Sequence, residues 1–219
     1  MKALGAVAAV LCTFFWSVAA GAAPVASAAT AGAPVAASPA APVVVDPWAE
    51  QPWDQRRALP NDSRPPKRRE PLHMLPPLPT DPAAVGMVRR VALPDGPKVA
   101  ALTFDLCELD TVTTGYNAAI INFLRAEKLP ATLFMGGKWM RTHAARVRQV
   151  LTEPLFEVGN HAWSHGNFAL LSPEGMRAQV LWTQAQYELL REDALAAARA
   201  VGGPQPSIPP VPVLFRLPY

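Results

Sequence analysis

Hydrophobic residues change their spacing repeatedly over the second half of the chain, from continuous runs to every third or fourth position. The short apolar runs predict strands at residues 87–93, 98–104, 131–135, 156–158 and 211–215. The helical spacing predicts helices at residues 116–129, at 139–151, and from Pro173 to the glycine pair Gly202-Gly203. The turn Pro94-Asp95-Gly96 separates the first two apolar runs, which makes a hairpin plausible.

Strands that alternate with helices indicate an α/β fold with parallel strand pairing. Three residues with useful chemistry, Asp105, His161 and Arg216, each come just after a predicted strand or at its end. In parallel sheets and barrels the carboxyl ends of the strands carry the chemistry. We therefore expect these three side chains to lie at one edge of the sheet.

The first 23 residues have the features of a secretory signal peptide. Lys2 provides the positive charge, residues 4–20 form a short apolar core rich in alanine, and Ala20-Gly21-Ala22 offers a cleavage site. An uncleaved membrane anchor is the alternative. This segment predicts export to the periplasm or the extracellular space.

Residues 24–86 are expected to form a disordered linker, and residues 87–219 a folded domain. Residues 24–97 contain 16 of the 25 prolines. The later part of the linker is basic and could contact an anionic envelope surface, although a solvated linker is the simpler interpretation. Residues 99–219 contain ten basic and ten acidic residues, so this part is formally neutral and the positive net charge lies before residue 99. A nucleic-acid partner is not indicated.

Only two cysteines are present, and Cys12 would leave with the signal peptide. The remaining Cys107 cannot form an internal disulfide, so the exported fold must depend on its hydrophobic core. Cys107 lies close to Asp105 in the sequence, where a thiolate could bind a metal. A small buried residue is the interpretation favoured here.

The pair His161 and His165 is the most specific chemical signal in the chain. Two imidazoles four residues apart at the end of a strand can bind one cation, and imidazole is a usual ligand of zinc and related metals. A zinc metallopeptidase is disfavoured, because Ala162 occupies the position at which that motif has its glutamate.

Three motifs occur in the order of a known family: Thr103-Phe104-Asp105, the pair His161 and His165, and Arg216-Leu217-Pro218-Tyr219. Together they resemble the first three motifs of the polysaccharide deacetylases (the NodB-homology enzymes, or carbohydrate esterase family 4). The resemblance covers residues 87–219 and implies the front portion of an irregular (β/α) barrel. It also implies a metal-dependent hydrolase that removes N-acetyl groups from peptidoglycan, a chitin-like oligomer or an exopolysaccharide.

The resemblance assigns a role to each motif residue. Asp105 matches the general base, and His161 and His165 match metal ligands. Arg216 would orient Asp105, and the backbone N–H of Tyr219 would contribute to the oxyanion hole. The implied cofactor is a divalent metal, zinc by preference, with cobalt, manganese and nickel as alternatives. The oligomeric state is left open.

Leu106 departs from the family pattern, because it replaces the aspartate that binds the metal. Either Asp105 becomes the third ligand while Glu108 or Asp110 acts as the base, or the site uses two histidines and waters with Asp105 as the base. The family's later motifs, Asp-x-x-Asp-Trp and Leu-x-x-His, would come after Tyr219. An alternative function is therefore a truncated, inactive remnant that binds metal or glycan without turnover.

Overall fold

The computed structural model describes residues 46–57, 59, 62, 64–74, 99–108 and 114–219. The signal sequence, the strand expected at 87–93, the turn at 94–96 and Asp110 lie outside the described residues. No helix in the described part of the chain is long and apolar enough to cross a membrane.

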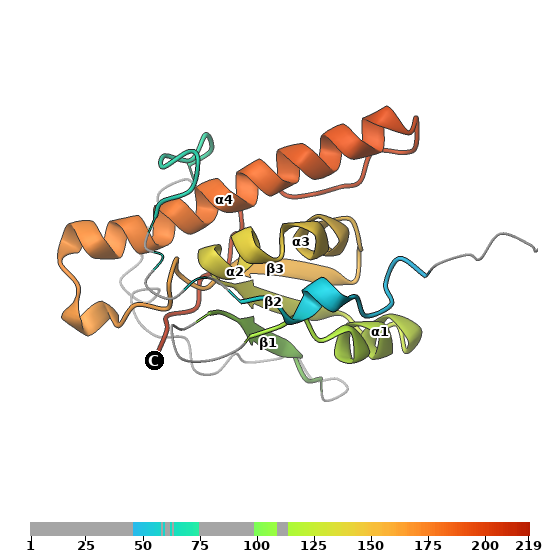
Figure 1. Cartoon of the computed structure of the whole chain (residues 1–219), viewed down its shortest axis with the longest axis horizontal. Coiled ribbons are helices and arrows are strands. Elements are labelled where there is room, and N and C mark those ends of the chain that lie inside the picture. The colour runs from blue at the N-terminus through green and yellow to red at the C-terminus, as the bar shows by residue number, and fades with distance from the viewer. Residues whose placement is uncertain (1–45, 58, 60–61, 63, 75–98, 109–113) are drawn as a thin grey trace, which may run out of the picture. The chain divides into compact units, whose positions relative to one another are not determined.

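Three parallel strands form the sheet, β1 (Thr103–Leu106), β2 (Ala131–Met135) and β3 (Phe156–Asn160), in the order β1-β2-β3 (Figure 1). This confirms the expected α/β class with parallel pairing. The first strand begins later than predicted and extends two residues beyond Phe104, so Cys107 is the residue directly after its end.

Four α-helices accompany the sheet, α1 (Ala118–Ala126), α2 (Gly137–Thr142), α3 (Ala144–Leu151) and α4 (Pro173–Ala200), with short 3-10 helices η1 (Pro52–Gln55) and η3 (Phe168–Leu170). The side chain of Asn117 caps α1, and that of Ser172 caps α4 by accepting from Gly175 N–H. The helix predicted at 139–151 is two helices, because His143 leaves helical geometry with ψ at 35°.

The two faces of the sheet have different surroundings. Leu133 of β2 and Val158 of β3 belong to the hydrophobic core, which includes residues of all four α-helices. Leu106 packs against the same core. Successive side chains of a strand point to opposite faces, so Asp105 and its register partner Phe134 face the other way. The helices therefore cover one face, and the chemistry gathers on the other.

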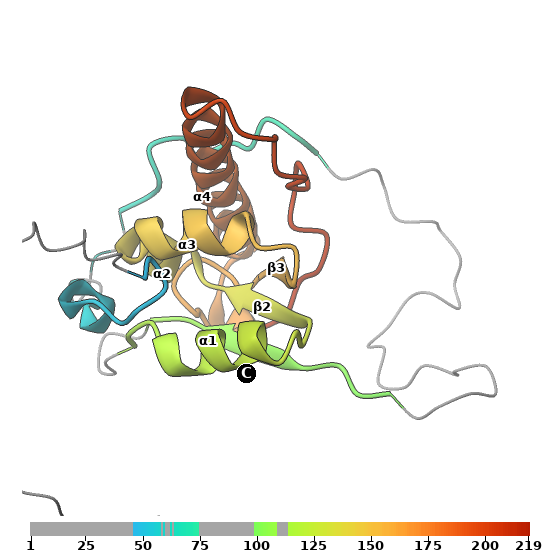
Figure 2. The same cartoon turned by 90° about the vertical axis from the view of Figure 1, so that its right-hand side faces the viewer.

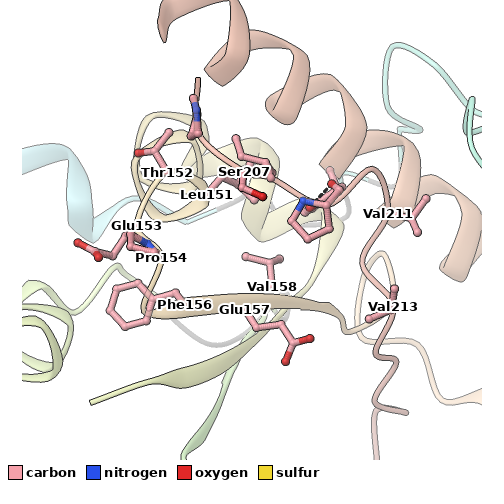
Figure 3. Close-up of a pocket in the computed structure, with 14 residues that line it drawn as sticks. Leu151, Thr152, Glu153, Pro154, Phe156, Glu157, Val158, Ser207, Val211 and Val213 are labelled. Atoms are coloured by element: carbon pink, nitrogen blue, oxygen red, sulfur yellow. Dashed lines mark hydrogen bonds between the residues drawn. The ribbon is translucent and has the colours of Figure 1, made fainter. Parts of the chain in front are cut away.

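The segment predicted as a last strand, 211–215, forms only a single parallel bridge between Phe215 and Asn160, so that prediction was wrong in extent. Between this segment and the free edge of β3 lies a cavity of about 570 Å³ (Figure 3). Phe156 and Val158 line it from the strand, and Val211 and Val213 from the C-terminal segment. The edge of β3 is thus left largely without strand partners within the described residues.

Two stretches expected to belong to the linker, residues 46–57 and 64–74, contact the helices (Figures 1 and 2). Asp54 is fully buried and pairs with Arg146 of α3 at 2.6 Å. Arg68 pairs with the buried Glu188 of α4 at 3.1 Å. These buried ion pairs show that the folded unit extends further toward the N-terminus than residue 87.

Candidate functional site

The site forms where the three strands end and the register continues for one further residue. Gly136 N–H donates to the carbonyl of Leu106 at 2.8 Å, and His161 N–H donates to that of Met135 at 3.1 Å. By the alternation of the strands, Cys107 and His161 lie on the same face as Asp105. The expected proximity of Asp105 and His161 is present, with 3.9 Å between Asp105 Oδ2 and His161 Nε2.

Arg216 holds Asp105 across the open face of the sheet. Its Nη1 donates to Asp105 Oδ1 at 2.6 Å, and its Nη2 donates to Thr103 Oγ1 at 3.1 Å. The guanidinium lies 4.1 Å from the centre of the Phe134 ring, a cation–π contact. The side chain of Asp105 is still 40% exposed, so a substrate or a water can reach its carboxylate.

The backbone of Arg216 is fixed at the end of β3. Asn160 N–H donates to Leu214 O at 2.8 Å, and Arg216 N–H donates to Asn160 O at 3.0 Å. No long strand forms in this described segment, and these two hydrogen bonds hold the backbone of the arginine beside β3. The proximity of Arg216 to Asp105, expected from strand ends alone, therefore depends on one short bridge.

His161 has its tautomer set by the same segment. Its Nδ1 lies 3.0 Å from the carbonyl oxygen of Arg216, and a carbonyl can only accept, so Nδ1 carries the proton. The lone pair is then on Nε2, which is buried without a hydrogen-bond partner among the described residues. Only 2% of the residue is exposed. A buried acceptor left unpaired is costly, so this nitrogen is suited to a ligand.

His165 completes the pair in a strained backbone conformation, with φ at 55°. Its ring centre lies 5.0 Å from that of His161, in an edge-to-face arrangement. Burial lowers the pKa of His165, and the neighbouring His161 lowers it further. The neutral imidazole that results is the form that binds metals.

Helices α2 and α4 support the loop that carries the histidines. Gly137 N–H donates to Ala162 O at 3.0 Å. Gln179 of α4 accepts from Ser164 N–H at 2.9 Å and donates to Ser164 Oγ at 2.9 Å. A Cβ atom on Gly137 would lie 2.1 Å from the ring of Trp163, so glycine is needed there for space. Neither Gln179 nor Gly137 was predicted from the sequence to support the site.

Cys107, for which the sequence left open a small buried residue or a metal-binding thiolate, lies beside the two histidines. It is only partly buried, and its sulfur lies with one ligand atom each of His161 and His165 in a group whose members are all within 4.8 Å of one another. The available signal was its position two residues after Asp105, which places both on one face once β1 is known to continue to Leu106. Burial raises the pKa of the Cys107 thiol, and the charges of Asp105 and Glu108 raise it further.

These donors fit a divalent metal ion: two imidazoles and a sulfur, with one nitrogen of each imidazole, Nε2 of His161 and Nδ1 of His165, buried without a hydrogen-bond partner among the described residues. Asp105, expected as the base or as a third ligand, and Glu108, expected as an alternative base, have other partners. One carboxylate oxygen of Asp105 is bound to Arg216. Glu108 is buried and accepts a hydrogen bond from Thr142 at 3.0 Å, on the side of α2.

Tyr219 lies beside the histidines but is 81% exposed, with φ at 66°. Its ring centre is 4.8 Å from that of His165. A second cavity, of about 360 Å³, borders the site and is lined by Asp105, Cys107 and Trp139 together with residues of α1 and of the segment preceding it. The motif residues expected from the sequence are thus gathered in one place, and their roles stay predictions.

Comparison with known proteins identifies the family. The family model described as polysaccharide deacetylase matches residues 92–203, just over half of the chain. The chain therefore belongs to the polysaccharide deacetylase family, as the motifs of the sequence indicated.

Individual relatives are more distant. An uncharacterised 30.6 kDa protein of Geobacillus stearothermophilus is 29% identical over 79 residues, which are 36% of this chain and 28% of that protein. The solved peptidoglycan deacetylase PdaC of Bacillus subtilis is 30% identical with a TM-score of 0.38, covering 54% of this chain and 48% of its own. A family 4 carbohydrate esterase from Bacillus anthracis is 27% identical with a TM-score of 0.36, covering 41% of each chain. Each match spans less than half of the relative's length.

Proposed function

We propose that this protein is an exported, metal-dependent hydrolase that removes N-acetyl groups from a glycan, and that its described sheet is the front portion of an irregular (β/α) barrel. The observation that supports this best is the arrangement around Arg216. Its side chain holds Asp105, and its carbonyl leaves the Nε2 lone pair of His161 free within 3.9 Å of the same carboxylate. A proton acceptor and a metal ligand are thereby positioned by one residue.

Asp105 takes the proton from the water that attacks the acetyl carbonyl. General acid–base catalysis of this kind contributes about 10²–10⁴-fold to the rate. The second oxygen of Asp105 lies 3.9 Å from His161 Nε2, and Arg216 restrains the first oxygen. His161 and His165 would hold a divalent metal, which would supply the Lewis acidity that amide hydrolysis needs. The backbone N–H of Tyr219 is assigned to the oxyanion.

Peptidoglycan, a chitin-like oligomer or an exopolysaccharide is the proposed substrate class. The peptidoglycan deacetylase PdaC among the similar solved structures supports the first of these. A cell-envelope glycan also agrees with the signal-like residues 1–23, which support export to the periplasm or the extracellular space.

A second function, binding of metal or glycan without turnover, is favoured by the other two histidines of the chain. His143 is buried and hydrogen-bonded to the carbonyl of Thr114, and His73 lies against Glu188. Neither is therefore placed beside Asp105 to protonate the departing amine. The two functions differ in turnover alone.

Release of acetate from peptidoglycan and from N-acetylglucosamine oligomers by the zinc-loaded chain tests the proposal. Turnover that is abolished by a chelator and restored by added metal supports the deacetylase. Glycan or metal binding with no acetate released would leave the binding function in its place.

A further inference from the structure

We propose that the Cys107 thiolate is the third protein ligand of the metal, in place of the carboxylate that Leu106 lacks. This rests on the proposed metal dependence of the site, but not on its turnover. The result would be a site of one sulfur and two imidazoles, which is a different metal chemistry from one aspartate and two histidines.

The alternation of side chains along β1 puts Cys107, and not Leu106, on the face of the sheet that carries Asp105. Leu106 packs against the helical core, so its side chain cannot reach the open face. Cys107 comes next and returns to the face that carries Asp105.

The neighbours of Cys107 leave its sulfur accessible to an ion. Between Cys107 and His161, at the same level of the sheet, stands Gly136. A Cβ atom on Gly136 would be 3.5 Å from Cys107 Cβ, so the absence of a side chain leaves space beside the thiol. The ligand atoms of Cys107, His161 and His165 all lie within 4.8 Å of one another.

An independent observation at His161 points to the same ligand. Its Nε2 is buried, has no hydrogen-bond partner in the described part of the chain and, from the bond at Nδ1, carries a lone pair. Metal-binding histidines commonly donate their other ring N–H to a carbonyl in this way. One oxygen of Asp105 is engaged by Arg216, and the sulfur of Cys107 is the third member of the group of ligand atoms.

A thiolate is a softer ligand than a carboxylate, so the site should prefer zinc and cobalt over manganese and magnesium. Three protein ligands plus an open position is also the common arrangement of catalytic zinc. Cys107→Asp should keep a three-ligand site but shift its preference toward manganese.

The test is cobalt binding to the full 219-residue chain, combined with its absorption spectrum. We expect one cobalt per chain with a near-ultraviolet thiolate-to-cobalt charge-transfer band. The band should persist in Cys12→Ser, which removes the only other thiol, and disappear in Cys107→Ser and Cys107→Asp. Zinc affinity should fall at least about 10-fold in Cys107→Ser, the lower end of what loss of even an outer partner costs.

Thiol alkylation gives a second readout that does not require a Cys107 variant to fold. In the Cys12→Ser chain, zinc should slow alkylation of Cys107 by at least about 10-fold, magnesium should not, and His161→Ala should abolish the protection. Cobalt bound without the charge-transfer band, or alkylation unaffected by zinc, would overturn the thiolate ligand while leaving the metal-dependent deacetylase intact. Failure to bind any cobalt would overturn both this ligand and the metal dependence.

Discussion

Asp105 is an asymmetric carboxylate: one oxygen accepts from Arg216 at 2.6 Å, and the other lies 3.9 Å from His161. The sequence left open whether Asp105 is the general base or a metal ligand, and this asymmetry distinguishes between the two roles. An oxygen engaged by a guanidinium is restrained, and the remaining oxygen is close to a nitrogen with a free lone pair. The arrangement supports Asp105 as the base rather than as a ligand.

Asp105→Asn should lower the rate of deacetylation about 10²–10⁴-fold, because the amide cannot accept the proton of water. Bound zinc should stay at the wild-type level, measured by elemental analysis. Asp193→Asn is the matched control, since Asp193 is 62% exposed and pairs with Arg148 at 3.6 Å only. Loss of zinc in Asp105→Asn would instead make Asp105 a ligand.

Metal should also stabilise the fold, because the ligands come together only in the native state. At a free zinc concentration about 100 times Kd, the free energy of unfolding should rise by about 2.7 kcal/mol. Thermal unfolding with and without zinc measures this, and His161→Ala should remove the increase. A wild-type melting temperature that zinc does not change would contradict the site.

At the scale of single elements, the loop 161–165 is supported by the first turn of α2. Gly137 permits Trp163 to lie against the helix, and its N–H is bound to Ala162 O. Any side chain here must displace the indole, and with it the loop between the two histidines. The geometry of the proposed metal site is therefore coupled to a glycine that has no side chain to bind a ligand.

Gly137→Ala should destabilise the protein by about 1–3 kcal/mol, the usual cost of overpacking, and should weaken zinc binding as well. Urea unfolding and zinc titration measure the two effects. Gly175→Ala is the control, because its Cβ would meet nothing closer than 3.5 Å in the first turn of α4. If both variants lose the same stability and zinc affinity, contact with Trp163 is not the cause of these losses.

Several elements were predictable because their signals are local. The apolar run at 131–135 is β2, and the Ser172-Pro173 signal begins α4. The break of the helix at His143 was not predictable, since the helical spacing of apolar residues continues across it. The sequence could not decide between the two interpretations of Cys107, because the face on which Cys107 lies depends on where β1 ends, and strand ends are poorly fixed by sequence.

On the scale of the whole molecule, residues 46–57 around Asp54 belong to the folded unit, which their composition did not indicate. Proline content suggested a linker, but η1 buries a carboxylate against Arg146, which also binds the carbonyl oxygens of Pro47 and Ala49. Periodicity cannot reveal such a contact, because it joins residues 92 positions apart. The folded unit therefore includes residues 46–57, which precede the matched family region.

Asp54→Ala should destabilise the protein by roughly 3–5 kcal/mol at neutral pH, because it leaves the buried Arg146 without its anion. Chemical unfolding at about pH 7 measures this. The exposed pair of Arg148 and Asp193 again serves as the control, and Asp193→Asn should change the free energy of unfolding by less than about 0.5 kcal/mol.

The same pair predicts acid sensitivity. Burial opposes ionisation of Asp54, but hydrogen bonds from Arg146 and from the Gln51 backbone outweigh it and leave the pKa below the ordinary 3.8. Its contribution is therefore complete above pH 3.8 and is lost as the pH falls through the lower folded value. Unfolding curves between about pH 5 and about pH 2 should show a smaller acid loss in Asp54→Ala than in the wild type. Equal losses of stability in the two proteins would show that Asp54 does not contribute to the acid sensitivity.

The contact between Arg216 and Asp105 has a consequence for the order of folding. It joins residues 111 positions apart, and the same segment sets the tautomer of His161. Closing so long a loop is slow compared with pairing neighbouring strands, so this contact should form among the last. During refolding, β1, β2 and β3 should assemble before the site can capture zinc. Metal uptake should then lag behind the recovery of secondary structure, and the chain would complete its site only in the final step of folding.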